Sequence, residues 1–269
     1  MSEGGAGRSV VVTEADGPGR TLAARLVEAG VDVRILPVVM HSAAPDPAPL
    51  ADALARLPEY AWVAFTSVRA VDAACPSAAW RQWPWAIATR PRVAAVGPVT
   101  RAALLRHRVP VALCPESLGA RALAQAIIDA EGGSLSGLTV FWPRSNIARR
   151  DFGDALCAAG GRLVAPVAYC TQSVRPANLA DVLADIDAGR IGCVTFLSPS
   201  AAAGLAALMP DGTLSALAGR TLVASVGPTT SSALAGLGAP ATLEAASRTA
   251  GGLASALLRY FGLNDRNPT

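Results

Sequence analysis

The chain has 269 residues, 52% hydrophobic and 16% charged, so it is long enough for two domains that each bury a core. All 23 Lys and Arg positions are arginine, which excludes a Schiff-base lysine, a P-loop lysine and a pyridoxal-phosphate anchor. A net charge of +3 is small for a protein that binds nucleic acid, and no apolar run approaches the ~18 residues of a membrane span. We therefore expect neither a nucleic acid nor a membrane as a partner.

The few metal-binding side chains predict a protein without a metal site. His41 and His107 are the two histidines, and we expect both at the surface. The five scattered cysteines are expected to be buried free thiols. Residues 1–7 have no signal-peptide pattern, so we predict loose tails at 1–7 and 263–269 and a cytoplasmic location.

Strands and helices alternate along the first half of the chain. A strand at 9–13, a helix at 21–29 and a strand at 31–37 form one β-α-β unit, and a proline-rich break follows at 42–49. The later patterns predict a helix at 50–57, a strand at 62–65, an irregular tryptophan-rich segment at 80–85, a strand, turn and helix at 93–105, a strand at 109–113 and a helix at 117–130.

The second half of the chain repeats the first. It begins with a strand at 138–142, a polar turn at 144–146, a helix that ends near Leu156 and a strand at 162–169. Phrases at 65–70 and 96–100 recur about 130 residues later, at 196–201 and 226–230. Two homologous α/β halves predict two parallel-sheet domains, and the repeated polar turns favour a shared site between the halves.

Five strand-to-helix junctions are the candidate binding sites. Each places backbone amides, hydroxyls or an arginine at the carboxyl edge of a parallel sheet, where open α/β sheets bind ligands. Several such junctions suit a ligand with many carboxylates, whereas helix capping and a surface salt bridge of the arginine are the alternatives. The candidates are Thr66, Ser67, Gly97, Thr100, Arg144, Ser145, Ser198, Ser200, Gly227, Thr229 and Thr230.

Tyr169 is the one proton donor at the end of a predicted strand. Its hydroxyl stays protonated at neutral pH and can donate to a leaving hydroxyl, although a structural bond to a carbonyl is the alternative. Glu14, Asp16 and Glu116 lie near strand ends without a paired arrangement, and we expect them in solvent. Tyr169 is therefore the candidate catalytic residue.

Several motifs, in this order and spacing, resemble those of the uroporphyrinogen-III synthases over residues 9–261. Each motif alone is weakly specific, but their combination is strong. They are Phe-Thr-Ser-x-x-Ala-Val at 65–71, Arg144 with Arg149, Leu156 and Gly160, then Val167-x-Tyr169, Phe-x-Ser-Pro-Ser-Ala at 196–201, Val-Gly-Pro-Thr-Thr at 226–230, and Thr249-x-x-Gly252-Leu253.

This resemblance implies a fold. Two flavodoxin-like α/β domains would be joined by a two-stranded linker, with the ligand cleft between them. Residues 8–37 and 172–262 would form one domain and residues 41–167 the other. The linker strands would lie near 38–40 and 167–169.

The resemblance also implies a reaction. The family closes the linear tetrapyrrole hydroxymethylbilane to uroporphyrinogen III, with loss of water and inversion of the last ring through a spiro intermediate, and uses no cofactor or metal. A monomer is expected, and the upstream bilane-forming enzyme is a candidate partner. Tyr169 matches the family's candidate acid, Arg149 is a further family position, and Ser67, Thr100, Ser198 and Thr229 or Thr230 match its binding hydroxyls.

Three positions depart from the family pattern. Thr13-Glu14-Ala15 stands where Thr-Arg-Pro is frequent, Ser145 where Gly is frequent, and Leu197 where the second Phe-Thr-Ser would have Thr. A different class of function is therefore kept open, namely a non-catalytic two-domain hinge-type protein that binds a tetrapyrrole or another polyanion. A glycosyltransferase is disfavoured because nucleotide-binding glycine motifs and a plausible base are missing.

Overall fold

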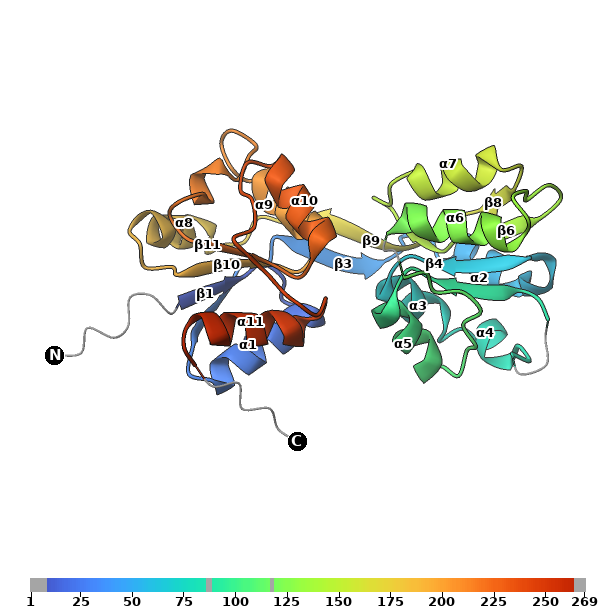
Figure 1. Ribbon diagram of the computed structural model, residues 1–269, viewed down its shortest axis with the longest axis horizontal. Helices are drawn as coiled ribbons and strands as arrows, with labels where there is room; N and C mark the ends of the chain where they lie inside the picture. The colour runs from blue at the N-terminus through green and yellow to red at the C-terminus, as the bar shows by residue number, and fades with distance from the viewer. Residues whose placement is uncertain (1–8, 86–88, 117–118, 264–269) are drawn as a thin grey trace. The chain divides into compact units, whose positions relative to one another are not determined.

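The computed structural model describes residues 9–85, 89–116 and 119–263, which divide into two compact units (Figure 1). The first unit contains the described residues up to Met40 and from Gln172 onward, and the second contains His41–Thr171. Each unit is built on a parallel sheet with helices, which confirms the predicted α/β class. The predicted tails, apart from residue 263, and the start of the helix predicted at 117 lie outside the described residues.

The sheet of the first unit has five parallel strands in the order β12-β11-β10-β1-β2. The chain starts one strand in from an edge and winds outward to both sides, which is the flavodoxin order. β1 and β10 are buried along their whole length, as expected for apolar runs in central parallel strands. The strands are β1 (Ser9–Val12), β2 (Asp32–Ile35), β10 (Cys193–Phe196), β11 (Leu222–Ser225) and β12 (Leu243–Glu244).

Helices cover both faces of this sheet. Val11 of β1 packs into the core on one face, and its neighbours Val10 and Val12 pack into the core on the other. This alternation follows from the two-residue period of a strand. One face carries α1 (Pro18–Glu28) and α11 (Ala250–Tyr260), and the other carries α8 (Leu179–Asp187), α9 (Pro199–Ala206) and α10 (Pro228–Gly236), with the 3-10 helix η2 (Ser215–Leu217) before β11 (Figure 1).

The second unit has four parallel strands in the order β5-β4-β6-β8, and a parallel bridge between Ala94 and Leu113 extends the sheet beyond β5. The strands are β4 (Trp62–Phe65), β5 (Arg92–Ala95), β6 (Thr139–Phe141) and β8 (Arg162–Val164). One face packs against α2 (Ala48–Ala55), the 3-10 helix η1 (Leu57–Glu59), α3 (Val68–Ala74), α4 (Ala78–Gln82) and α5 (Pro98–Arg106), and the other against α6 (Ala120–Ala130) and α7 (Asp151–Ala158).

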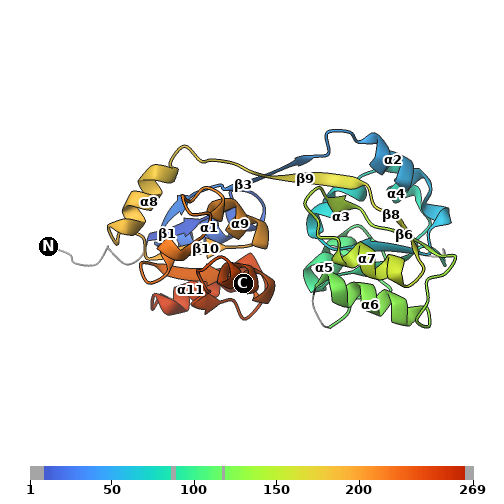
Figure 2. The same cartoon turned by 90° about the horizontal axis from the view of Figure 1, so that it is seen from above.

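The chain passes between the units twice, within β3 (Val39–Ala43) and within β9 (Val167–Ser173) (Figure 2). These two strands and the two-residue β7 (Arg144–Ser145) form a small sheet in the order β3-β9-β7. The crossing strands therefore carry Tyr169 and bring the polar segment after β6 next to it.

The sequence repeat does not coincide with the two units. Its first copy supplies β1 and β2 to the first unit, and β4, β5 and the Leu113 bridge to the second. Its second copy supplies β6 and β8 to the second unit, and β10, β11 and β12 to the first. Each sheet is thus assembled from both copies, and both sheets have the same order because each copy is divided at the same point.

Two local predictions around the tryptophans and Pro110 are wrong. Helix α4 includes residues 80–82 of the irregular segment predicted at 80–85, and Trp80 is buried against Phe65 and Trp85. The Trp80 ring therefore packs within the core of the second unit. The strand predicted at 109–113 makes only the bridge of Leu113, since Pro110 has no N–H to donate to a strand ladder.

Two further local predictions concern the segments around Tyr169. The strand predicted at 162–169 is divided into β8 and β9, because Pro166 interrupts the hydrogen bonding between them. The polar turn predicted at 144–146 begins as strand β7, which pairs with β9. The division lets β9 leave the main sheet and pair in the crossing sheet.

The cysteines are all free thiols. Cys75, Cys170 and Cys193 are buried as expected, Cys114 is half-buried, and Cys157 is exposed, which corrects the prediction for that residue. Burial raises the pKa of the Cys75 thiol to about 12, and it also raises the pKa of Cys193. Both buried thiols therefore stay protonated at neutral pH.

Candidate functional site

Tyr169 and Ser67 are joined by a hydrogen bond in the second unit. The Tyr169 hydroxyl donates to Ser67 Oγ over 3.1 Å, and Ser67 Oγ also accepts from the backbone N–H of Ala70 at the start of α3, over 3.2 Å. A serine oxygen offers two acceptor positions and one donor, so the Ser67 proton is still available to a ligand. The structure thus brings the candidate acid and one candidate binding hydroxyl together.

Thr66 links the ends of two neighbouring strands. Its Oγ1 accepts a hydrogen bond of 3.1 Å from the indole Nε1 of Trp142, the residue after β6. Trp142 is buried and packs against Phe152 of α7. The hydrogen bond therefore links the segments that follow β4 and β6, directly before Ser67 in the chain.

Arg144 binds backbone carbonyls in the structure. Its guanidinium donates to the carbonyl of Ala165 over 3.1 Å and to that of Ser145 over 3.0 Å, and it lies 6.0 Å from the centre of the Trp142 ring. Ser145 is buried, and its hydroxyl lies 3.4 Å from Thr171 Oγ1. These two predicted binding residues fix the path of the chain between β6 and β9.

A polar network extends from this segment along β9. Asn146 Oδ1 accepts from the N–H of Thr171 over 2.8 Å, and Asn146 Nδ2 donates to the Thr171 carbonyl over 3.3 Å. Thr171 Oγ1 lies 3.1 Å from His41 Nδ1, and the His41 ring lies 6.3 Å from the Tyr169 ring. His41, expected at the surface, is half-buried within this network, which corrects that prediction.

His41 and Thr171 were not singled out from the sequence. They lie on strands about 130 residues apart, and their pairing depends on the crossing of β3 and β9. No local periodicity marks such a pair in a single sequence. A polar residue two positions after Tyr169 is the one available signal, because β9 places residues 169 and 171 on the same side.

The glycine junctions begin helices α5 and α10. Gly97 and Gly227 are the residues before these helices, and both have extended backbones. Thr100 and Thr230 are 4% and 3% exposed, whereas Thr229 is exposed. Of the predicted threonines, Thr229 therefore presents its side chain to solvent.

Arg248 lies over the Gly227 junction, although nothing in the sequence pointed to it. A Cβ added at Gly227 would lie 3.1 Å from Cγ of Arg248. Glycine at this position thus allows the arginine side chain to approach the turn. An arginine and an exposed threonine give this junction a character that suits an anion.

Ser198 in the first unit has the same capping role as Ser67 and a different partner. Its Oγ accepts from the N–H of Ala201 over 3.2 Å, donates to Glu14 Oε1, and lies 3.0 Å from Ser200 Oγ. Glu14 is 5% exposed, so the expectation of a solvated carboxylate is wrong. The hydrogen bond from Ser198 stabilises the buried carboxyl group. The spacing of charged residues in the sequence does not predict this contact.

Arg149 lies apart from these contacts. It is exposed and forms an ion pair with Asp151, whose pKa is lowered by the hydrogen bond from Arg149. Its side chain is 85% exposed. The structure therefore does not join Arg149 to the network around Tyr169.

Neither a metal centre nor a membrane helix is found in the described parts of the chain. No group of three or more His, Cys, Asp or Glu residues within 9–85, 89–116 and 119–263 could hold a metal ion. Among the described helices, none combines the length and the hydropathy that crossing a bilayer requires.

Solved structures of two bacterial proteins have a similar fold. A mutant uroporphyrinogen III synthase of the extreme thermophile Thermus thermophilus matches with a TM-score of 0.70 and 16% identity, over 94% of this chain and 97% of that chain. Uroporphyrinogen-III synthetase of Helicobacter pylori matches with a TM-score of 0.53 and 15% identity, over 94% and 99%. At these identities the likeness shows the two-domain fold.

The comparison of sequences gives the family. A search of curated proteins found no match. The family model described as uroporphyrinogen-III synthase HemD matches residues 20–255, which is most of the chain and includes every candidate site residue named above. This chain therefore belongs to the uroporphyrinogen-III synthase HemD family, whose place is in tetrapyrrole biosynthesis.

Proposed function

We propose that this chain is a hydro-lyase that closes hydroxymethylbilane to uroporphyrinogen III without a cofactor. Membership of the family over residues 20–255 supports the reaction. The hydrogen bond between Tyr169 and Ser67 carries the mechanism, because it joins a protonated phenol to a hydroxyl that still has a proton to donate.

In the first step, the C–O bond of the terminal hydroxymethyl group breaks. The oxygen keeps the bonding electrons, takes a proton from Tyr169, directly or through the Ser67 hydroxyl, and leaves as water. The nitrogen of the same pyrrole supplies electrons and leaves an azafulvene cation. Acid catalysis thus accelerates the loss of water, and the azafulvene carbon of the substrate is the electrophile of the next step.

In the second step, the substituted carbon of the opposite terminal ring attacks the azafulvene and forms the spiro intermediate. The bond between this substituted carbon and the methylene bridge from the preceding ring then breaks and leaves an azafulvene cation on that preceding ring. The free carbon of the terminal ring attacks this methylene carbon, which inverts the terminal ring. The free carbon loses its proton, and this proton restores the Tyr169 phenol. The protein's larger task is to hold the folded substrate so that the substituted carbon is the one that attacks.

The carboxylates of the substrate would be bound at the strand-to-helix junctions. Exposed Thr229 with Arg248 suits one carboxylate in the first unit. Where Tyr169 protonates the leaving group directly, the Ser67 hydroxyl suits a contact in the second unit. Ser198 is already bonded to Glu14, so a ligand there would compete with the protein's own carboxylate. Buried Thr100 and Thr230 would act by supporting their junctions.

We further propose that the protein acts as a monomer in the cytoplasm and receives its substrate from the bilane-forming enzyme. Direct transfer from that enzyme suits a substrate that cyclises spontaneously once it is released. Size-exclusion chromatography with light scattering tests the monomer, for which a mass near 27.3 kDa is expected.

The reaction is tested by the identity of the cyclic product. Freshly prepared hydroxymethylbilane is incubated with the full chain, and the products are oxidised and separated by isomer. We expect isomer III with the native protein and isomer I with the heat-denatured protein, because unassisted closure gives isomer I. Isomer I alone with the native protein would overturn the proposal and favour the non-catalytic binding protein.

A further inference from the structure

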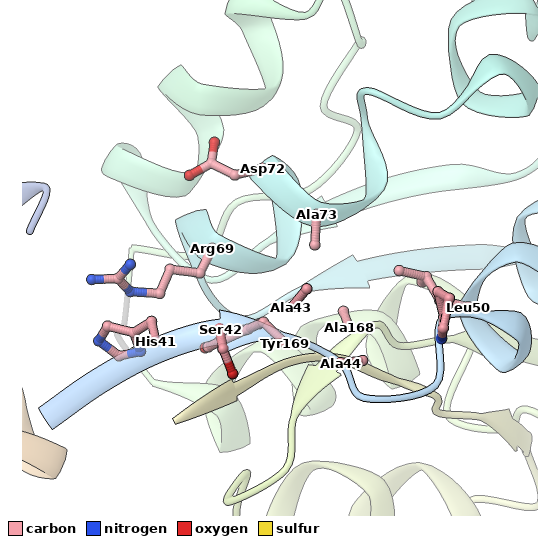
Figure 3. A pocket seen from close by; sticks show the side chains of 11 residues that line it. His41, Ser42, Ala43, Ala44, Leu50, Arg69, Asp72, Ala73, Ala168 and Tyr169 are labelled. Atoms are coloured by element: carbon pink, nitrogen blue, oxygen red, sulfur yellow. The ribbon is translucent and has the colours of Figure 1, made fainter. Parts of the chain in front are cut away.

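A pocket of about 430 Å³ opens in the second unit beside Tyr169 (Figure 3). Its lining comes from β3, α2, α3 and β9, including His41, Leu50, Arg69 and Tyr169. All of these residues belong to one compact unit. The volume falls within the range of about 300–1,000 Å³ that is typical of small-molecule sites.

The pocket combines a cation with an apolar floor. Arg69 is half-buried, and no hydrogen bond or ion pair joins its guanidinium to another residue within the described ranges. In Figure 3 the Arg69 side chain extends toward the end of the pocket where His41 lies, and Leu50 lies at the other end. The small side chains of Ala73 and Ala168 leave room for a flat ring between the two ends.

The one acidic side chain of the lining does not neutralise this cation. Asp72 is exposed, and in Figure 3 its carboxylate points away from the other labelled side chains. No ion pair between Asp72 and Arg69 exists in the structure. A half-buried guanidinium without a carboxylate partner favours an anionic ligand, and its planar fork fits a carboxylate with two parallel hydrogen bonds.

The two copies of the repeat differ at this position. Arg69 is the second residue after Ser67, and Ser200 is the second after Ser198. Ser200 is bonded to Ser198, which is bonded in turn to Glu14. The junction in the first unit thus has a serine and a buried carboxyl group nearby, whereas the junction in the second unit has an arginine and a pocket, so the two junctions differ in the charge they offer a ligand.

We propose that this pocket binds the terminal pyrrole that carries the leaving hydroxymethyl group, with Arg69 holding a carboxylate of that ring. This inference rests on the proposed function. Tyr169 lines the same pocket, so a ring seated there brings its hydroxymethyl group to the donor that protonates it. The pocket therefore selects which end of the linear tetrapyrrole meets the acid.

A binding measurement tests the pocket without turnover. The probe is a monopyrrole with one acetate and one propionate side chain, titrated into the full chain and followed by NMR chemical shifts. Arg69→Gln should weaken binding about ten-fold or more, since it removes a charge-assisted hydrogen bond. The matched control Arg106→Gln, at an exposed position on α5 of the same unit, should leave binding unchanged.

A second variant tests the shape of the pocket with its charge intact. Ala73→Leu fills the floor from helix α3 and should also weaken binding of the monopyrrole about ten-fold. Its folding is checked by the circular dichroism of the native state. Binding equal to the wild type in either Arg69→Gln or Ala73→Leu would overturn the assignment of the pocket.

Kinetics with the linear tetrapyrrole separate this inference from the proposed function. Arg69→Gln should raise KM about ten-fold and change kcat much less, because the contact is made in the bound substrate. Normal formation of isomer III with an unchanged KM would overturn the pocket alone. Monopyrrole binding that depends on Arg69, together with isomer I as the sole product, would uphold the pocket and overturn the proposed function.

Discussion

At the scale of single residues, the two serines that cap helices have different roles because their hydrogen-bond partners differ. Ser67 and Ser198 cap corresponding helices in the two copies of the repeat, and the sequence predicted both as binding hydroxyls. The structure gives Ser67 the phenol of Tyr169 and gives Ser198 the buried carboxyl of Glu14. Residue type and local position were predictable, whereas the partners come from other strands and leave no local pattern.

Tyr169→Phe removes the proposed proton donor with little change in shape. We expect kcat to fall by about 10²–10⁴, the range for a positioned general acid, while KM changes little. The measurement is the steady-state rate of isomer III formation. Tyr260→Phe is the matched control, since Tyr260 is 60% exposed at the end of α11, and it should keep the wild-type rate. Equal rates in Tyr169→Phe and the wild type would contradict the role of Tyr169.

The variants Ser198→Ala and Ser67→Ala show how much each capping serine contributes to the free energy of unfolding. Each variant loses a helix cap, which costs about 0.5–2 kcal/mol. Ser198→Ala also leaves the buried Glu14 carboxyl short of a hydrogen bond, which adds about 1–3 kcal/mol. Urea unfolding should therefore show the larger loss for Ser198→Ala. Equal losses would mean that the Ser198 contact contributes nothing to Glu14.

At the scale of elements, the start of helix α1 shows what periodicity cannot predict. The apolar spacing predicted a helix at 21–29, but α1 begins at Pro18, and Gly19 lies in its first turn. The chain turns sharply between β1 and α1, so that Gly19 lies against the backbone of Glu14. Strand and helix cores follow from the hydrophobic pattern, while their ends depend on such close approaches.

Gly19→Ala tests this close approach. A Cβ there would lie 2.0 Å from the Glu14 carbonyl oxygen, so the turn must shift, and we expect a loss of about 1–3 kcal/mol or more in the free energy of unfolding. Gly236→Ala on α10 is the control, because a Cβ there meets nothing within 4 Å. It should be neutral or stabilising by up to about 1 kcal/mol in urea unfolding. A neutral Gly19→Ala would contradict the tight turn.

At the scale of the whole molecule, the repeat predicted two α/β sheets but not how they are assembled. The β-branched runs and the recurring junctions indicated parallel strands in both halves of the chain. The exchange of strands through β3 and β9 could not follow from them, because each copy has the same pattern whether or not it folds on its own. The boundaries of the two units are therefore set by pairing between strands that are far apart in the sequence, which the repeat alone does not specify.

This exchange predicts which fragments fold. Residues 41–171 contain a complete sheet with a core on each face, so this fragment should give dispersed NMR spectra and cooperative thermal unfolding. A fragment of equal length that follows the repeat, residues 9–139, should remain unfolded, because it carries incomplete parts of two sheets. Cooperative folding of residues 9–139 would contradict the strand exchange.

The most direct test of the whole account is the initial rate of isomer III formation from hydroxymethylbilane, measured against protein concentration with and without a metal chelator. A cofactor-free enzyme predicts a rate proportional to protein concentration and unaffected by the chelator. A rate of isomer III formation that does not rise with protein concentration, or that the chelator abolishes, would contradict it.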